Sequence, residues 1–344
     1  MKIEELWPQL EAVRVTAGSQ RGDSGWVLRQ LRPEAACPLH AAVELSTGQR
    51  GLLLCIAPEL VPPKRRWPRC RGLEVLAARE GAQVLFGVTL KEARHADVFT
   101  ALAEDLARRI IDSPGLPAKV VALIGGLARW QKFLSASVEG LSEEAQRGLW
   151  GELYFLRENL LPVLGPGAVN GWKGGERAHQ DFQFERGAIE VKTTLAKQPQ
   201  VVRITSERQL DNSAWAVLFL HVIALDMRDG SGETLPALVA SLRDGLATDA
   251  AAREKFEDEL LISGYLDVHA GRYAERGYIV RTLSLFRVGT KFPCFVEKNL
   301  PPGVGDISYG LSVSACESFR AKPEDVTIAL IDNEQRNPRR RSRV

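Results

Sequence analysis

Polar and apolar side chains alternate in two runs within residues 171–195, one before and one after Arg186 and Gly187. An alternation with a period of two is typical of half-buried strands, and the Arg-Gly pair between the runs indicates a tight turn. We therefore predict a β-hairpin here. Its apolar face would anchor it in a core through Phe182, Phe184, Ile189 and Val191.

The polar face of this hairpin carries charged residues whose spacing depends on the turn. A two-residue turn at Arg186-Gly187 would pair Glu185 with Ala188, Gln183 with Glu190, and Asp181 with Lys192. Asp181 and Glu190 would then be diagonal neighbours, with Cβ atoms roughly 7 Å apart. Two carboxylates at that separation can share a dication that prefers oxygen ligands, and Lys192 can reach the same point. A three-residue turn without a bulge would instead put the two acids on opposite faces.

The pattern of residues 1–95 predicts mainly β-structure. Short apolar runs, separated by Gly and Pro, predict strands at 25–31, 41–45, 50–56 and 83–90. Helical spacing of apolar residues then predicts helices over 96–111 and 117–138.

A second domain is predicted to begin after Gly140. Ser142 followed by two glutamates is typical of a helix start, and this helix is expected to continue to about Leu164. Strands are expected at 201–205, 214–225, 278–288 and 307–313, with a short polar helix start at 206–211 and helices at 235–246 and 250–262. This order indicates an α/β fold, in which helices flank a mixed central sheet. The predicted domains are 1–140, β-rich and accessory with two connecting helices, 141–335, and a basic tail at 336–344.

Glu152 interrupts the apolar stripe of the 143–164 helix, between Leu149 and Leu156. An ionisable carboxylate on a packing face costs free energy unless a partner compensates it. Glu152 is therefore a candidate site residue. The alternative is a glutamate at the edge of the stripe, reaching solvent or paired with an arginine.

Composition narrows the class of protein. The chain has 344 residues, 45% hydrophobic and 26% charged, which suits two globular domains. No apolar run approaches the roughly 20 residues needed to cross a bilayer, and the N-terminus is too acidic for a signal peptide, so we expect a soluble cytoplasmic protein with no membrane partner. The five cysteines show no paired spacing, which argues against a disulfide framework or a zinc site.

The net charge of +2 does not by itself indicate a polyanion partner, but two local segments are basic. Residues 61–71 form a Pro-rich basic loop containing Trp67, which either touches a phosphate backbone and stacks on a base or is simply solvated. The tail at 336–344 either grips a polyanion or is an ordinary charged terminus. Trp172, next to Lys173, either packs under the hairpin or stacks on a base.

Taken together, these residues resemble the PD-(D/E)XK nuclease superfamily. The segments that carry the resemblance are Gly151-Glu152-Leu153, His179-Gln180-Asp181-Phe182, Ile189–Thr194 and Ser206–Asp211. More narrowly, they are similar to an uncharacterised bacterial PD-(D/E)XK family found near restriction-modification and phage-defence genes. Gln180 stands where the name-giving pattern has proline.

The resemblance implies a restriction-endonuclease-like core and a role for each residue. Asp181 and Glu190 would be the main ligands of Mg²⁺, for which Mn²⁺ can substitute, with the Val191 carbonyl as a third ligand and Glu152 holding a metal-bound water or a second ion. Lys192 would orient the attacking water or stabilise developing negative charge. Gln209, after the next strand, is a further candidate catalytic residue.

The resulting hypothesis is a Mg²⁺-dependent endodeoxyribonuclease associated with restriction or phage defence. Its partners would be DNA and other defence-system subunits, and cleavage of both strands would favour a homodimer. One alternative is a catalytically silent subunit that uses the same fold to bind DNA or protein. Another is a structural protein in which the acids and lysine form an incidental ion pair cluster, with no affinity for divalent ions.

Overall fold

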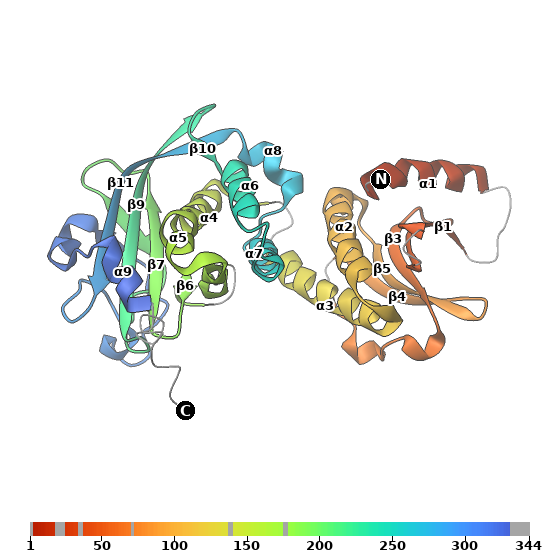
Figure 1. The fold of residues 1–344 in the computed structure, drawn as a ribbon, viewed down its shortest axis with the longest axis horizontal. Coiled ribbons are helices and arrows are strands. Elements are labelled where there is room, and N and C mark those ends of the chain that lie inside the picture. The colour runs from red at the N-terminus through yellow and green to blue at the C-terminus, as the bar shows by residue number, and fades with distance from the viewer. Residues whose placement is uncertain are drawn as a thin grey trace, which may run out of the picture. The chain divides into compact units, whose positions relative to one another are not determined.

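The computed structural model describes residues 3–17, 25–33, 37–69, 72–136, 140–174 and 178–330. The chain divides into two compact units (Figure 1). Unit 1 comprises Met1–Gly140 and Leu266–Val268, and unit 2 comprises Leu141–Tyr265 and His269–Val344. The basic tail predicted at 336–344 lies outside the described residues. None of the described helices combines the length and the apolarity needed to cross a membrane.

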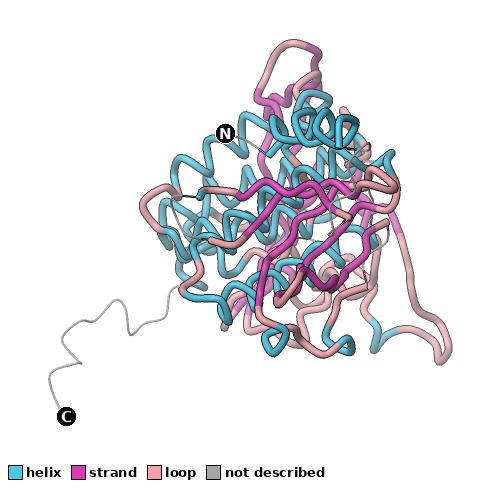
Figure 2. The backbone as a smooth tube through the Cα atoms, turned by 90° about the vertical axis from the view of Figure 1, so that its right-hand side faces the viewer, coloured by secondary structure: helices cyan, strands magenta, loops and turns pink. Residues whose placement is uncertain are grey.

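Unit 1 is built on a five-stranded antiparallel sheet with strand order β1-β2-β3-β5-β4. Figure 2 traces strands in magenta and helices in cyan. The strands are β1 Trp26–Gln30, β2 Leu39–Glu44, β3 Arg50–Ile56, β4 Leu73–Glu80 and β5 Gln83–Leu90, and the helices are α1 Ile3–Ala17, α2 Ala96–Asp112 and α3 Gly115–Ala136.

Two elements of unit 1 differ from the prediction. The chain opens with helix α1, although the pattern was interpreted as mainly β up to residue 95. Pro8 lies inside this helix and obscures its spacing, but Leu6, Trp7 and Leu10 are buried and hold it in place. Strand β4 was not predicted because it is an edge strand, in which charged residues interrupt the apolar pattern.

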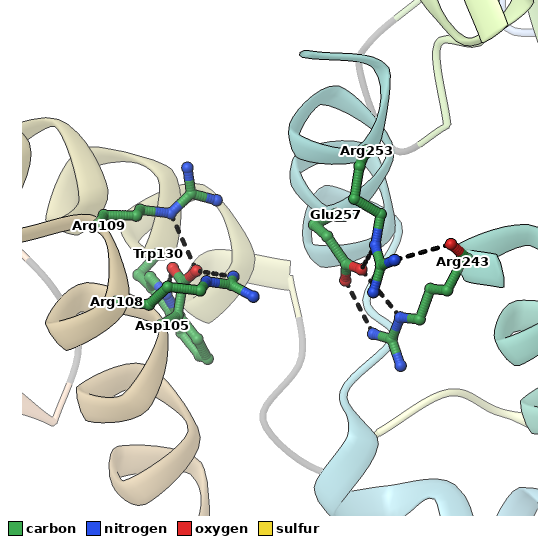
Figure 3. Close-up of polar contacts among 7 residues, drawn as sticks. All are labelled: Asp105, Arg108, Arg109, Trp130, Arg243, Arg253 and Glu257. Atoms are coloured by element: carbon green, nitrogen blue, oxygen red, sulfur yellow. Dashed lines mark hydrogen bonds and ion pairs between the residues drawn. The ribbon is translucent and has the colours of Figure 1, made fainter. Parts of the chain in front are cut away.

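Asp105 joins helices α2 and α3 of unit 1 (Figure 3). Its carboxylate accepts hydrogen bonds from Arg109 Nε at 2.9 Å, Arg108 Nη2 at 2.9 Å and Trp130 Nε1 at 3.0 Å. Burial alone would raise the pKa of Asp105, but these donors and the arginine charges hold that pKa below its ordinary value. The carboxylate is therefore ionised and stabilises the helix pair at neutral pH.

Unit 2 contains a mixed five-stranded sheet of order β10-β11-β9-β7-β6, in which β7 and β9 are parallel and the other pairs antiparallel. A second, two-stranded sheet pairs β12 with β8. The strands are β6 Phe182–Gln183, β7 Gly187–Thr194, β8 Val201–Ile204, β9 Val217–Asp229, β10 Glu233–Thr234, β11 Arg276–Val288 and β12 Tyr309–Ser312. The predicted α/β class with a mixed central sheet is confirmed.

Helices pack on one face of this sheet, and the two-stranded sheet packs on the other. The helices are α4 Glu143–Phe155, a π-helical turn Leu156–Leu160, α5 Leu161–Leu164, α6 Leu235–Gly245, α7 Ala250–Ile262, α8 Ala270–Tyr273 and α9 Pro323–Leu330. Ser142 caps α4 as predicted, because its side chain accepts from Ala145 N at 3.2 Å. The helix start predicted at 206–211 is wrong, since these residues form a hydrogen-bonded turn.

A second arginine cluster joins α6 and α7 within unit 2 (Figure 3). The Glu257 carboxylate accepts from Arg243 Nε at 2.9 Å and Nη2 at 2.8 Å, and from Arg253 Nε at 2.9 Å. Arg253 also donates to the Arg243 carbonyl at 2.7 Å. The bidentate geometry fixes the angle between the two helices.

The core of unit 2 also encloses a histidine. His221 on β9 is 4% exposed, and its ring packs on Phe155 with 4.7 Å between centroids. Within the described part of the chain, neither ring nitrogen has a hydrogen-bond partner. Burial lowers the pKa of His221 to about 4, so the ring is neutral in the folded protein at neutral pH.

We expect His221 to make the protein acid-sensitive. Its pKa lies below the ordinary value of about 6.5, so the unfolded chain binds the proton first as pH falls. Stability should decline between pH 6.5 and 4, by at most about 1.4 kcal/mol per pH unit. Urea unfolding should therefore show that the free energy of unfolding falls less between pH 7 and pH 5 for His221→Leu than for the wild type. The exposed His179→Leu should keep the wild-type loss, and equal losses for all three proteins would contradict this account.

Candidate active site

Strands β6 and β7 form the predicted hairpin, but its register differs from the prediction. The observed pairs are Phe182 with Ile189 and Gln183 with Ala188, and Phe184 N donates to Gly187 O at 2.9 Å across the turn. The predicted pairings of Asp181 with Lys192, Gln183 with Glu190 and Glu185 with Ala188 are therefore wrong. Continued by one residue, the observed register places Asp181 directly opposite Glu190. A shift of this size keeps the same faces, so both acids still lie on one side.

Gly187 explains the shift. It is the first residue of β7 and pairs with Val217 of the parallel neighbour β9. A Cβ atom at Gly187 would lie 2.7 Å from Val217 Cγ1 and 3.0 Å from the Val217 carbonyl oxygen. The glycine is therefore needed for close approach of two strands rather than for the turn, and the turn moves to Glu185 and Arg186.

The apolar face of the hairpin is as predicted. Phe182, Ile189 and Val191 are buried in the core beneath α4, and partly buried Phe184 packs against the same cluster. This packing fixes the strands that carry Asp181, Glu190 and Lys192.

Helix α4 brings Glu152 to the hairpin. Gly151 allows the close approach, because a Cβ atom there would lie 2.3 Å from Thr193 Cγ2 on β7. The Glu152 carboxylate accepts from Trp172 Nε1 at 2.9 Å. Trp172 is fully buried and its ring lies 5.7 Å from that of Phe256, which supports core packing rather than base stacking. Its role toward Glu152 was not visible in the sequence, because the two residues are twenty positions apart.

The other three charged groups lie around β7, where Lys192 contacts Glu190 and the Asp181 carboxylate contacts the backbone between them. Lys192 Nζ lies 2.5 Å from Glu190 Oε1, and Asp181 Oδ2 accepts from Val191 N at 2.7 Å. Lys173 N donates to the Asp181 carbonyl at 2.9 Å, which holds the segment after Trp172 beside Asp181. The Lys192 side chain is 17% exposed and that of Glu190 is fully buried.

Burial dominates the electrostatics of the acids. Burial, and then the charge of Asp181, raises the pKa of Glu190 to about 8. Burial and Asp181 likewise raise the pKa of Glu152 well above its ordinary value, against the opposing effect of the Trp172 hydrogen bond. The pKa of Asp181 is also raised by burial, and Lys192 and the Val191 N–H limit the rise. In the absence of a cation, the acids therefore retain protons at a pH where exposed carboxyls are ionised.

The pKa of Lys192 is also raised, which for a lysine favours the charged form. Burial alone would lower its pKa, but the charges of Glu190 and Asp181 raise that pKa above the ordinary value. Lys192 is therefore a cation near neutral pH, as expected for a group that stabilises negative charge.

The donor set fits a hard divalent cation. Glu190 Oε1 contacts Lys192 Nζ, and Glu190 Oε2 has no hydrogen-bond partner among the described residues, so the buried carboxylate keeps an oxygen available as a ligand. No three Asp, Glu, His or Cys side chains of the described residues already form a metal-binding group. A preformed cage is not required, because Mg²⁺ usually binds through one or two carboxylates and keeps several waters.

Gln209 does not have the environment of the acids. Its amide oxygen accepts from Thr205 N at 2.9 Å and Oγ1 at 3.2 Å, so it stabilises the turn after β8. Its catalytic role remains a prediction.

Gln180, by contrast, holds the hairpin to that turn. Its buried amide donates to the carbonyls of Arg208 at 2.8 Å and Gln209 at 3.3 Å, and accepts from Gln183 at 3.1 Å and Trp215 at 3.2 Å. Proline at this position could make none of these bonds. Gln180 therefore fixes the residue before Asp181 by side-chain hydrogen bonds, a role the sequence pattern did not suggest.

Comparison with known proteins agrees with this geometry. Residues 3–314 match the family described as "Putative PD-(D/E)XK family member, (DUF4420)". The chain belongs to this family, and the matched residues include parts of both units. A search of curated proteins and of solved structures finds no relative of the chain.

We expect the Trp172 hydrogen bond to stabilise unit 2 measurably. Trp172→Phe removes the donor to Glu152, and a hydrogen bond to a protonated carboxyl contributes about 0.5–1.5 kcal/mol. Trp150→Phe is a matched control, because Trp150 is 1% exposed and its indole nitrogen has no hydrogen-bond partner among the described residues. Urea unfolding at pH 8 should show the larger loss for Trp172→Phe. When Glu152→Ala is added to both variants, their losses of stability should become equal. Equal losses while Glu152 is intact would rule out the contact between Trp172 and Glu152.

Proposed function

We propose that this protein is a Mg²⁺-dependent endodeoxyribonuclease. The observation that carries the proposal is one buried cluster of acids, in which Glu190 contacts Lys192 and the Asp181 carboxylate accepts from Val191 N between them. The charges of Asp181, Glu190 and Lys192 also act on the pKa of Glu152. Membership of a PD-(D/E)XK family supports the same class of reaction, hydrolysis of a phosphodiester.

In this proposal the ligands of the cation are Asp181, Glu190 and the Val191 carbonyl, with Glu152 binding a coordinated water or a second ion. The chemistry supplied by a dication here is charge neutralisation at the scissile phosphate and activation of water. Lys192 remains protonated and stabilises the negative charge that develops on the phosphate. Trp172 holds the Glu152 carboxylate in a fixed orientation.

A role in restriction or phage defence, with DNA and other subunits as partners, belongs to the same proposal. A single site cuts one strand in each binding event, so cleavage of both strands would favour a homodimer. The second candidate function is a silent binding subunit. The burial of Glu190 beside Asp181 favours the nuclease, because a relaxed binding surface gains nothing from a fully buried carboxylate that is compensated by one lysine and raised in pKa by a second acid.

We expect the protein to nick or cut DNA with Mg²⁺ or Mn²⁺ and not with EDTA. Glu190→Gln and Lys192→Met should each reduce the rate at least about 100-fold, the effect of removing one electrostatic stabiliser. The assay is gel analysis of supercoiled and linear DNA, with modified phage DNA as a further substrate.

Glu259→Gln is the matched control for Glu190→Gln. Glu259 is equally buried and forms an ion pair with Lys255, but it lies on α7 outside the acidic cluster. Its variant should keep wild-type cleavage. Cleavage that survives both site substitutions would refute the site, and tight DNA binding without nicking under any metal would favour the silent subunit.

A further inference from the structure

A compact cluster of unpaired cations lies in unit 1, between β3 and β4. Lys64, Arg65, Arg66 and Arg69 are all exposed, and Glu59 is the sole acid in residues 57–69. No ion pair to any of the four is found in the part of the chain that the structure describes. We call residues 64–69 the basic turn. Residues 70 and 71, which complete the loop singled out in the sequence, lie outside the described residues.

The basic turn is held in one conformation. Arg66 N donates to the Pro63 carbonyl at 2.9 Å, and Trp67 N donates to the Lys64 carbonyl at 3.0 Å. Pro62, Pro63 and Pro68 restrict the backbone on both sides. The cations are therefore presented on a preformed backbone, which reduces the entropy lost when a ligand binds.

Trp67 anchors the basic turn to the sheet. Its indole N–H donates to the Pro62 carbonyl at 2.8 Å, and its ring lies 5.5 Å from that of Phe86, which is fully buried on β5. Lys64 Nζ lies 5.9 Å from the ring centroid on the same tryptophan. Because the ring and its N–H are already engaged, Trp67 is not placed to stack on a base.

We propose that the basic turn binds the phosphate backbone of DNA without reading its sequence. Four like charges within six residues repel one another, and a polyanion relieves that repulsion while releasing its own counterions. The rigid presentation of the cations suits phosphates, and the engaged tryptophan does not stack on a base. The choice of DNA as the polyanion rests on the proposed function of unit 2. Unit 1 thereby acquires a role, which is to retain substrate for the site in unit 2.

The test measures binding in the absence of cleavage. The parent protein is the full chain with Glu190→Gln, and the probe is a fluorescent 30-base-pair duplex followed by anisotropy from 50 to 200 mM KCl. The basic-turn variant adds Lys64→Gln, Arg65→Gln, Arg66→Gln and Arg69→Gln. We expect at least tenfold weaker binding at 100 mM KCl. The slope of log K against log salt should become shallower by up to about 3.6, since each of the four phosphate contacts contributes about 0.9.

The matched control removes four exposed cations elsewhere, through substitution to Gln of Arg29, Arg79, Arg228 and Lys322. This control variant has the same net charge as the basic-turn variant. If DNA contacts the basic turn itself, the control should lose much less affinity for the duplex. Far-ultraviolet circular dichroism and the melting temperature of each variant establish that it is folded.

Equal slopes for the two quadruple variants overturn the proposal, as does the absence of DNA binding by the parent protein. So does a basic-turn variant that keeps DNA binding but loses capture by phosphatidylserine vesicles, because the turn would then serve a membrane. The two proposals fail separately. A shallower slope for the basic-turn variant, together with no cleavage by the wild type, would support the turn and count against the nuclease.

Discussion

The ion pair between Lys192 and Glu190 is the interaction on which the candidate site in unit 2 depends most. A fully buried glutamate is costly to ionise, and a single lysine on the same strand is the charged group that touches it. Because Asp181 directly precedes the neighbouring strand β6 and Glu152 lies on α4, one cation faces three acids. The sequence of unit 2 therefore tolerates an arrangement that a purely structural core would avoid, and this frustration is typical of functional sites.

The scaffold makes this arrangement possible through two close approaches. Gly187 lets β7 begin directly beside Val217 of β9, and Gly151 lets α4 rest on Thr193. The first sets the register that brings Asp181 opposite Glu190, and the second delivers Glu152. Hydrogen bonds from Trp172 and the Gln180 amide then fix the residues beside the acids. Packing and hydrogen bonding thus hold the charges together, and the charges do not hold the scaffold.

Much of this could be predicted from the sequence, because periodicity and local capping chemistry survive in the folded protein. Strand β3, strand β5 and helix α7 have the predicted bounds, and Ser142 caps α4. Helix α1 differs from the mainly β structure predicted for residues 1–95, because Pro8 inside it obscures the helical spacing. The predicted register is wrong by two residues because it places Gly187 in the turn. A glycine is needed there for a different reason, which is the close contact of β7 with Val217 on β9. The roles of Trp172 and Gln180 depend on contacts between distant segments, which no local pattern contains.

The central claim is that the buried acids form a divalent-cation site, and direct titration of Mn²⁺ tests it without reference to activity. Electron paramagnetic resonance counts free Mn²⁺ as it is added to metal-stripped protein at pH 7.5. The account predicts saturable binding that weakens at least tenfold in Glu190→Gln and is unchanged in Glu259→Gln, which is equally buried but outside the cluster. Binding that is equally strong in all three proteins, or absent from the wild type, would contradict it.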